Sequence, residues 1–114
     1  MKHRLSIITI CYNDRVGLER TLASVFAQTA QDFEYIVVDG GSTDGSVEVI
    51  ERNRDRITRW VSERDAGIYD AQNKGWRMGS APFVLFLNAG DILAGSDVIE
   101  RALRSEERRV GKEC

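Results

Sequence analysis

Cysteine and histidine are scarce in this chain, which has two Cys, Cys11 and Cys114, and one His, His3. A structural zinc site takes about four such ligands, so we expect none here. Cys11 lies in an apolar run and is expected to be a small buried residue, whereas Cys114 ends a charged segment. The two are not expected to form a disulfide, which fits a reducing compartment.

Excess charge of one sign and long apolar stretches are also missing. The formal net charge is −2, so bulk attraction to nucleic acid is not expected. No stretch approaches the ~20 apolar residues of a membrane-spanning helix, and the apolar run near the N-terminus is too short for a signal peptide. We therefore expect a cytoplasmic protein.

Three glycine-containing signatures are absent. No G-x-G-x-x-G follows the first predicted strand and no G-x-x-x-x-G-K-[ST] occurs, which argues against a dinucleotide-binding dehydrogenase and against a P-loop protein. Ser42 does not lie in a G-x-S-x-G segment, which argues against a hydrolase nucleophile.

What is present is a regular alternation of strand and helix patterns. Segments rich in β-branched and apolar residues predict strands at 5–11, 33–38, 57–62 and 83–87. Helices are predicted after Asn13 or Asp14, after a cap at Ser42 or Thr43, over 68–78, and after Ser96. This order predicts an α/β fold with a mostly parallel sheet of about four strands, right-handed crossovers and helices on both faces.

The fourth predicted strand organises the rest of the chain. The apolar run 83–87 follows Pro82, the only proline, and predicts a strand buried on both faces. Its carboxyl end leads into a turn that contains Asn88 and Asp91. Ligands of open α/β sheets bind at this end of the strands. Asp91 is therefore expected either to bind a hard cation or to cap the next turn or helix.

Polar residues fall at the carboxyl ends of several predicted strands, where they should converge: Tyr12 with Asn13, Asp39, Asp65, and Asn88 with Asp91. Tyr12 can stack on a nucleobase, and Asp39 can accept hydrogen bonds from a base or a ribose. A divalent cation on Asp91 could bridge two phosphates. The set predicts a site for a nucleoside diphosphate with its metal. The alternative is that turns are simply rich in Asp, Asn and Gly.

One domain is predicted over residues 1–103. From Arg104 the composition changes, since 104–114 holds a single aliphatic residue, Val110. Such a segment cannot add to a core. We expect a polar tail, of the kind left by foreign read-through when a gene is cut short.

Four segments, in this order and spacing, resemble motifs of the family 2 glycosyltransferases. They are SIITICYN at 6–13, VVDGGSTDG at 37–45, DAGIYDAQNKG at 65–75 and FLNAGD at 86–91. The resemblance covers roughly residues 4–103 and implies the nucleotide-binding half of the GT-A fold, which is Rossmann-like. The third segment resembles a subset that builds bacterial surface polysaccharides.

The resemblance implies transfer of a sugar, with inversion, from a nucleotide donor that is usually UDP-linked. The acceptor would be a saccharide or a lipid-linked saccharide, the latter reached at the inner face of a membrane. Carried over to this sequence, the resemblance implies the following substrate-site residues: Thr9 and Tyr12 around the base, Asp39 on the uracil, Asp65 and Asn73 beside the ribose and diphosphate, and Asn13 and Asn88 as further substrate-binding residues. Asp91 would hold Mg²⁺ or Mn²⁺.

Three departures from the family pattern matter. Ile10, followed by Cys11, stands where the family usually has a proline. The usual Asp-x-Asp reads NAGD, which leaves only Asp91, although one carboxylate can suffice when phosphates and water complete the shell. The acceptor half and its general base should follow residue 103 and are not in this sequence, so we expect the chain to have little or no transferase activity.

Three alternatives stay open at this point. The chain could bind UDP and a metal without transferring a sugar, or it could be an incomplete fold with no competent site. It could also be a nucleotidyltransferase, which shares the architecture. That class would want a Gly-rich phosphate loop after the first strand, where this sequence has CYND at 11–14.

Overall fold

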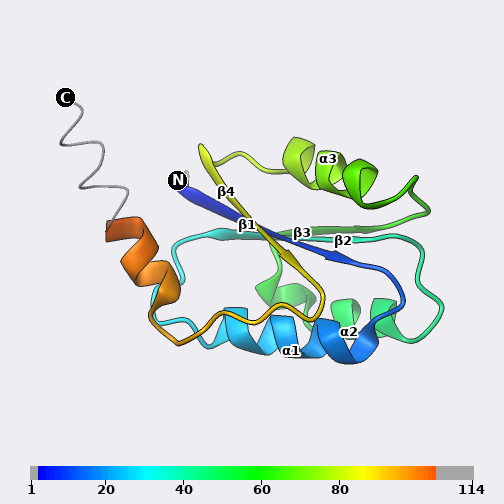
Figure 1. The fold of residues 1–114 in the computed structure, drawn as a ribbon, viewed down its shortest axis with the longest axis horizontal. Coiled ribbons are helices and arrows are strands. Elements are labelled where there is room, and N and C mark those ends of the chain that lie inside the picture. Colours follow the sequence, from blue (N-terminus) through cyan, green and yellow to red (C-terminus); the bar gives the residue numbers. More distant parts are fainter. Residues whose placement is uncertain (1–2, 105–114) are drawn as a thin grey trace.

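The computed structural model describes residues 3–104, so most of the expected tail, Cys114 included, lies outside the described residues. The elements, drawn in Figure 1, are β1 (Leu5–Cys11), α1 (Arg15–Phe26), β2 (Glu34–Asp39), α2 (Ser46–Arg52), a 3-10 turn η1 (Arg54–Arg56), β3 (Arg59–Ser62), α3 (Ile68–Met78) and β4 (Phe83–Asn88). A last described helix covers 98–104. Within 3–104, no helix is both long and apolar enough to cross a membrane.

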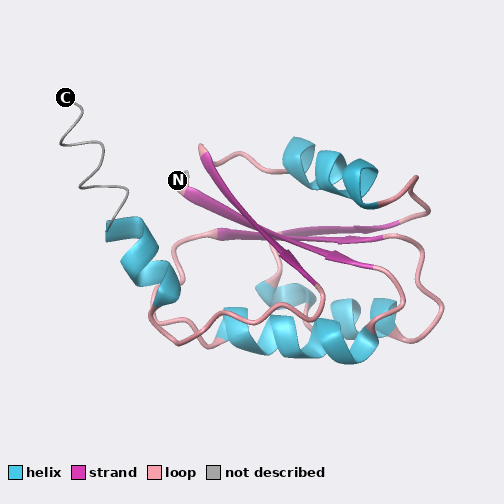
Figure 2. Ribbon diagram, viewed as in Figure 1, coloured by secondary structure: helices cyan, strands magenta, loops and turns pink. Residues whose placement is uncertain are grey.

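The four strands form one parallel sheet in the order β3-β2-β1-β4. Helices α1 and α2 lie on one face of it and α3 lies on the other (Figure 2). This confirms the predicted α/β fold. The chain first moves from β1 to β2 and later returns past β1 to β4, so the winding direction reverses between β1 and β4. Open α/β sheets bind ligands at such a reversal, beyond the carboxyl ends of the strands.

The two faces of the sheet carry cores of unequal size. Because strand side chains alternate between faces, Ile7 points into the larger core under α1 and α2, whereas Ile8 points into the smaller core under α3. Helix α3 comes very close to the sheet at Gly75. A Cβ added there would lie 2.4 Å from Cγ2 of Ile8.

Strand β4 is less buried than the apolar run predicted. Of its six residues only Leu87 is buried, and Phe83 is 38 % exposed. The reason is that β4 lies at the edge of the sheet, paired in the described part of the chain with β1 alone, while α3 packs on β1 and β2. The prediction of a strand buried on both faces is therefore wrong.

Of the first two predicted helix caps, the structure confirms one and contradicts the other. Asp14 caps α1, since its Oδ1 accepts the Gly17 amide at 3.0 Å. Helix α2 begins after Gly45, which has a φ of 99° and makes no side-chain cap, so the predicted cap at Ser42 or Thr43 is wrong. A left-handed φ is easily adopted by glycine, and it lets the loop turn directly into the helix.

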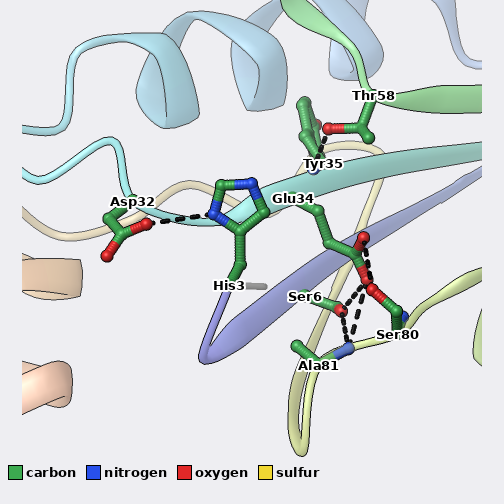
Figure 3. A network of polar contacts seen from close by, with 8 residues as sticks. All are labelled: His3, Ser6, Asp32, Glu34, Tyr35, Thr58, Ser80 and Ala81. Carbon is green, nitrogen blue, oxygen red and sulfur yellow. Dashed lines mark hydrogen bonds and ion pairs between the residues drawn. The ribbon is translucent and has the colours of Figure 1, made fainter. Parts of the chain in front are cut away.

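A polar network ties the amino-terminal ends of β1 and β2 to the loop that follows α3 (Figure 3). The buried Glu34 carboxylate accepts the Ser6 hydroxyl at 2.5 Å, the Ser80 amide, and the Ala81 amide at 3.3 Å. Burial raises the pKa of Glu34, but the hydrogen bonds from Ser6 and Ser80 outweigh it, and the resulting pKa lies below the ordinary value. This network is at the opposite end of the strands from the predicted site.

Candidate functional site

A cleft of about 520 Å³ opens at the carboxyl ends of the strands. This is within the size range of small-molecule sites. It is lined by residues of β1 and the following loop, the loop after β2, the loop after β3, the start of α3, and the end of β4 with its turn: Ile10, Cys11, Tyr12, Asp14, Gly40, Arg64, Asp65, Gly67, Ile68, Ala71, Asn88 and Ala89. The structure therefore brings together three of the predicted site residues, Tyr12, Asp65 and Asn88.

Tyr12 presents its ring at the cleft, with 65 % of the residue exposed. The chain leaves β1 sharply there, because the next residue, Asn13, has a φ of 48°. Asn13 fixes this turn from outside the cleft. Its amide donates to Ser42 Oγ and its Oδ1 accepts the Thr43 amide, both at 2.8 Å. Asn13 therefore ties the β1 loop to the β2 loop, and Tyr12 is held on that tied loop.

Asp39 is fully buried and its carboxylate is used inside the protein. Its Oδ2 accepts the amides of Gly41 and Ser42 and the hydroxyl of Ser62, and its Oδ1 accepts the Ser42 hydroxyl at 2.6 Å. The neighbouring Gly40, rather than Asp39, lines the cleft. In this structure Asp39 shapes the loop that forms one wall of the cleft.

Two other predicted residues lie away from the cleft. Thr9 is fully buried, and its hydroxyl is 2.7 Å from that of Tyr35. Tyr35 belongs to the core under α1 and α2, and burial raises the pKa of its hydroxyl. Asn73 is exposed on α3 and is not among the residues that line the cleft.

Asp65 and Arg64 form the wall on the α3 side. Asp65 Oδ1 accepts the Gly67 amide at 3.1 Å, and its Oδ2 lies against Gly40 on the opposite loop. Arg64 is the one basic residue among those that line the cleft. Arg64 is not among the predicted site residues, because a charged residue in a turn carries no local sign of a ligand.

Cys11 also lines the cleft, at a position where the sequence departs from the family pattern. Burial raises the pKa of its thiol, although hydrogen bonds with Ser46 and the Asp14 backbone act in the other direction. The thiolate is the reactive form of cysteine. We therefore treat Cys11 as part of the apolar wall and not as a nucleophile.

Asp91 closes the turn at the end of β4. Its Oδ2 accepts the Asn88 amide at 2.9 Å, and its own amide donates to the Asn88 carbonyl at 2.8 Å. The side chain therefore caps its own turn, while the helix at 98–104 receives its cap from Gln28, whose Oε1 accepts the Ile99 amide at 3.0 Å. The cap expected at Ser96 comes instead from Gln28, in the loop that follows α1. Asp91 is exposed, next to the cleft-lining pair Asn88 and Ala89.

Comparison with known proteins decides the family. The model of the family described as "Glycosyl transferase family 2" matches residues 6–109. The chain belongs to glycosyl transferase family 2. Over 102 residues it is 40 % identical to an uncharacterized glycosyltransferase of Mycobacterium tuberculosis, a match that covers 89 % of this chain and 39 % of that protein.

Two further matches agree with family 2 membership. Validoxylamine A glucosyltransferase of Streptomyces hygroscopicus is 38 % identical over 104 residues, covering 87 % of this chain and 24 % of that protein. The structure of S. aureus TarS in complex with UDP matches with a TM-score of 0.79 at 27 % identity, covering 91 % of this chain and 31 % of that one. The fold is thus the GT-A fold of family 2 glycosyl transferases. This family 2 chain spans less than half the length of the relatives compared here.

The site can be tested for its fit to the divalent cation that family 2 membership suggests. Residues 3–104 contain no group of three or more His, Cys, Asp or Glu side chains that could hold a metal. What the β4 turn offers is one exposed carboxylate, Asp91, beside the Asn88 amide. A carboxylate oxygen is a hard ligand that suits Mg²⁺ or Mn²⁺ when phosphates and water supply the other positions. The turn therefore fits a cation that arrives with a diphosphate.

Proposed function

We propose that this chain is the donor-binding part of an inverting glycosyltransferase that uses a UDP-linked sugar. The observation that carries the proposal is the meeting of Tyr12, Arg64, Asp65 and Asn88 around one cleft, at the reversal point of the sheet, in a family 2 chain. The UDP complex of TarS, a structure of 27 % identity, supports the choice of a uridine nucleotide.

Each residue has a role that its position allows. The exposed ring of Tyr12 stacks on the base. Asp65 accepts hydrogen bonds from the ribose. Arg64, as the basic residue of the cleft, pairs with the diphosphate. Asn88 completes the wall on the β4 side.

Two predicted residues act through the loops to which their side chains bond. Asp39 and Asn13 fix the loop after β2, which forms one wall of the cleft. A base stacked on Tyr12 would meet backbone groups of this loop. We assign no ligand contact to Thr9 or to Asn73, because neither lines the cleft.

Asp91 is the proposed ligand of Mg²⁺ or Mn²⁺. Such a cation, when bound, stabilises negative charge on the departing diphosphate. Asp91 itself supplies one anionic oxygen at the mouth of the cleft, held in place by its turn with Asn88.

The acceptor side is a separate part of the proposal. An acceptor hydroxyl must lose a proton during transfer, and we assign that general base to no residue of this chain. The chain covers 39 % of its mycobacterial relative, which supports placing the base and the acceptor site outside these 114 residues. The proposed acceptor is a saccharide or lipid-linked saccharide of surface polysaccharide synthesis, met at the inner face of a membrane.

Calorimetric titration of the full chain with UDP, with and without Mn²⁺, tests the donor site. We expect UDP to bind and Mn²⁺ to tighten binding. Asp91→Asn keeps the size of the side chain and should remove most of the Mn²⁺ effect while leaving metal-free binding nearly unchanged. Absence of UDP binding under both conditions, in a chain that melts cooperatively by circular dichroism, would contradict the proposal. Sugar transfer by the 114-residue chain would contradict the placement of the base.

A further inference from the structure

A row of three polar side chains begins on helix α1 and continues just past its C-terminal end. Thr21 and Ser24 lie at i and i+3 on one side of α1, and Gln28 follows two residues after the helix ends at Phe26. Thr21 is 0 % exposed and Gln28 is 4 % exposed. A buried polar group left without a partner costs about 1–3 kcal/mol, so this row needs hydrogen-bond partners.

The partners are backbone groups of the segment that follows β4. Ser24 Oγ accepts the Leu93 amide at 3.3 Å. Gln28 Nε2 donates to the Gly95 carbonyl at 2.7 Å, and its Oε1 caps the helix at 98–104. Residues 89–97 form turns and bends without helix or strand. Since such a segment cannot pair its own backbone groups regularly, this row of side chains fixes its path.

Thr21 contacts the part of this segment that carries Asp91. Its hydroxyl oxygen accepts the Gly90 amide at 2.9 Å. The hydroxyl also lies within donating distance of three carbonyl oxygens, of which that of Asp91 is nearest at 2.7 Å, followed by Gly17 at 3.1 Å and Asn88 at 3.4 Å. One buried hydroxyl therefore holds two consecutive residues of the turn. Gly90 has a φ of 101°, and glycine is the most freely moving residue in a chain. A tether at this point removes freedom that the turn would otherwise have.

We propose that Thr21 is a positioning residue for the cation-binding turn: its hydroxyl fixes Gly90 and Asp91 and so sets where the Asp91 carboxylate stands at the mouth of the cleft. This inference rests on the proposed function, since it concerns the same Asp91. Thr21 itself is buried and touches no ligand. Its effect should therefore appear in binding that depends on the cation and not in binding of the nucleotide alone.

The test measures the dissociation constant of UDP with and without Mn²⁺ in the full chain, and takes their ratio as the metal gain. Thr21→Val keeps the shape and removes the hydroxyl. We expect the metal gain to fall about tenfold, a usual size for coupling between two ligands, with metal-free affinity nearly unchanged. Thr21→Ser restores the hydroxyl and should restore the gain. Ser24→Ala is the matched control. It loses the hydrogen bond to the Leu93 amide, which lies in the same segment but after the Asp91 turn.

A double variant separates positioning from general loosening of the fold. If Thr21 acts through Asp91, then Thr21→Val added to Asp91→Asn should cause no further loss of UDP affinity in Mn²⁺. A full metal gain in Thr21→Val, or an equal loss in Ser24→Ala, overturns the inference while UDP binding by the wild-type chain still supports the proposed function. A wild-type chain that shows no UDP binding or no metal gain overturns the proposed donor site itself.

If Thr21→Val gives no cooperative melting transition, two other measurements test the inference. They are the metal gain of Thr21→Ser and the hydrogen exchange of the Gly90 amide in the wild-type chain. The Gly90 amide should exchange slowly with deuterium, since its partner is a buried hydroxyl. A retained gain in Thr21→Ser together with slow exchange at Gly90 supports the inference. Loss of the gain in Thr21→Ser, or fast exchange at Gly90, overturns it.

Discussion

Asp39 and Asn13 have side chains that could bind a nucleotide, yet the structure uses both to connect loops. Asp39 accepts four hydrogen bonds from Gly41, Ser42 and Ser62, and Asn13 bonds to the β2 loop. The residue that stays open to a ligand is Tyr12. Residue type alone could not separate these roles, because the same oxygen can serve a ligand or a loop amide.

Tyr12 is where loss of a single ring should weaken donor binding most directly. Stacking on one base is worth roughly 1–3 kcal/mol, so Tyr12→Ala should weaken UDP affinity by about 5- to 150-fold. Tyr69→Ala is the matched control, since Tyr69 is 79 % exposed on α3 and does not line the cleft. Titration of both variants with UDP checks this, and equal affinities would refute stacking at Tyr12.

Glu34 should make the free energy of unfolding fall as the pH is lowered into the acidic range. Its pKa is lowered in the folded state, so its contribution is present above the unfolded pKa, about 4.3, and is lost as the pH falls through the folded value. Glu34→Gln should lower the free energy of unfolding by about 1–3 kcal/mol at neutral pH. It should also make the free energy of unfolding decrease less steeply as the pH falls.

Urea unfolding of the Glu34 variant and a control across pH 3–7, a range of about four units around the carboxyl pKa, checks this. Asp32→Asn removes a carboxylate at the same end of the sheet, 3.0 Å from His3 but with a largely exposed side chain. Exposed ion pairs contribute little, so this variant should keep the acid dependence of the wild type. An unchanged slope in Glu34→Gln would show that the buried network does not carry the effect.

At the scale of elements, the packing of α3 depends on Gly75. Its added Cβ would lie 2.4 Å from Ile8 Cγ2 and 3.5 Å from Val38 Cγ2. In an exposed helix, Gly→Ala stabilises by about 1 kcal/mol, but overpacking here costs about 1–3 kcal/mol. Gly75→Ala should therefore destabilise or, at best, leave stability unchanged. Gly95→Ala is the control, because its nearest neighbour is Asp97 Oδ1 at 3.5 Å. Urea unfolding compares them, and clear stabilisation by Gly75→Ala would contradict this packing.

Most elements could be predicted from the sequence because their signals are local. The predicted strands at 5–11, 33–38, 57–62 and 83–87 differ from the observed bounds by no more than two residues. The periodic apolar residues and the Asp14 cap determine helices and strands through residues that are close together in the sequence. Two of the errors concern features that depend on distant partners: the burial of β4, and the start of the last helix, which Gln28 caps across 71 residues. The third, the cap of α2, is local, because Gly45 and not Ser42 or Thr43 precedes that helix.

The candidate site was only partly predictable for the same reason. Parallel strands bring their carboxyl ends to one edge of the sheet. The expectation that polar residues after the strands meet at this edge therefore identifies Tyr12, Asp65 and Asn88. It misses Arg64, which only the fold places in the cleft. It also misses Thr21, since a threonine in the middle of a helix carries no local sign that its hydroxyl will meet a turn 69 residues away.

At the scale of the whole molecule, the sheet separates two layers that differ in depth. Fourteen buried residues form the core on the α1 and α2 side, and five form the core on the α3 side within the described chain. Helix α1 contributes Leu18, Leu22 and Val25 as buried apolar side chains, whereas α3 contributes only Ala71. Both layers border the cleft, since it is lined by Ile68 and Ala71 of α3 and also by Cys11 of the larger core.

This difference predicts that α3 opens more readily than α1. A buried Leu or Val side chain stabilises by about 1.5–3 kcal/mol, so the two helices are held to the sheet by clearly different free energies. Local opening follows the apolar contacts of an element. Amides in the middle of α3 should therefore be protected from hydrogen exchange at least about tenfold less than those of α1. Exchange measured residue by residue, corrected for intrinsic rates, checks this, and equal protection of both helices would mean that the α3 layer opens only when the whole fold does.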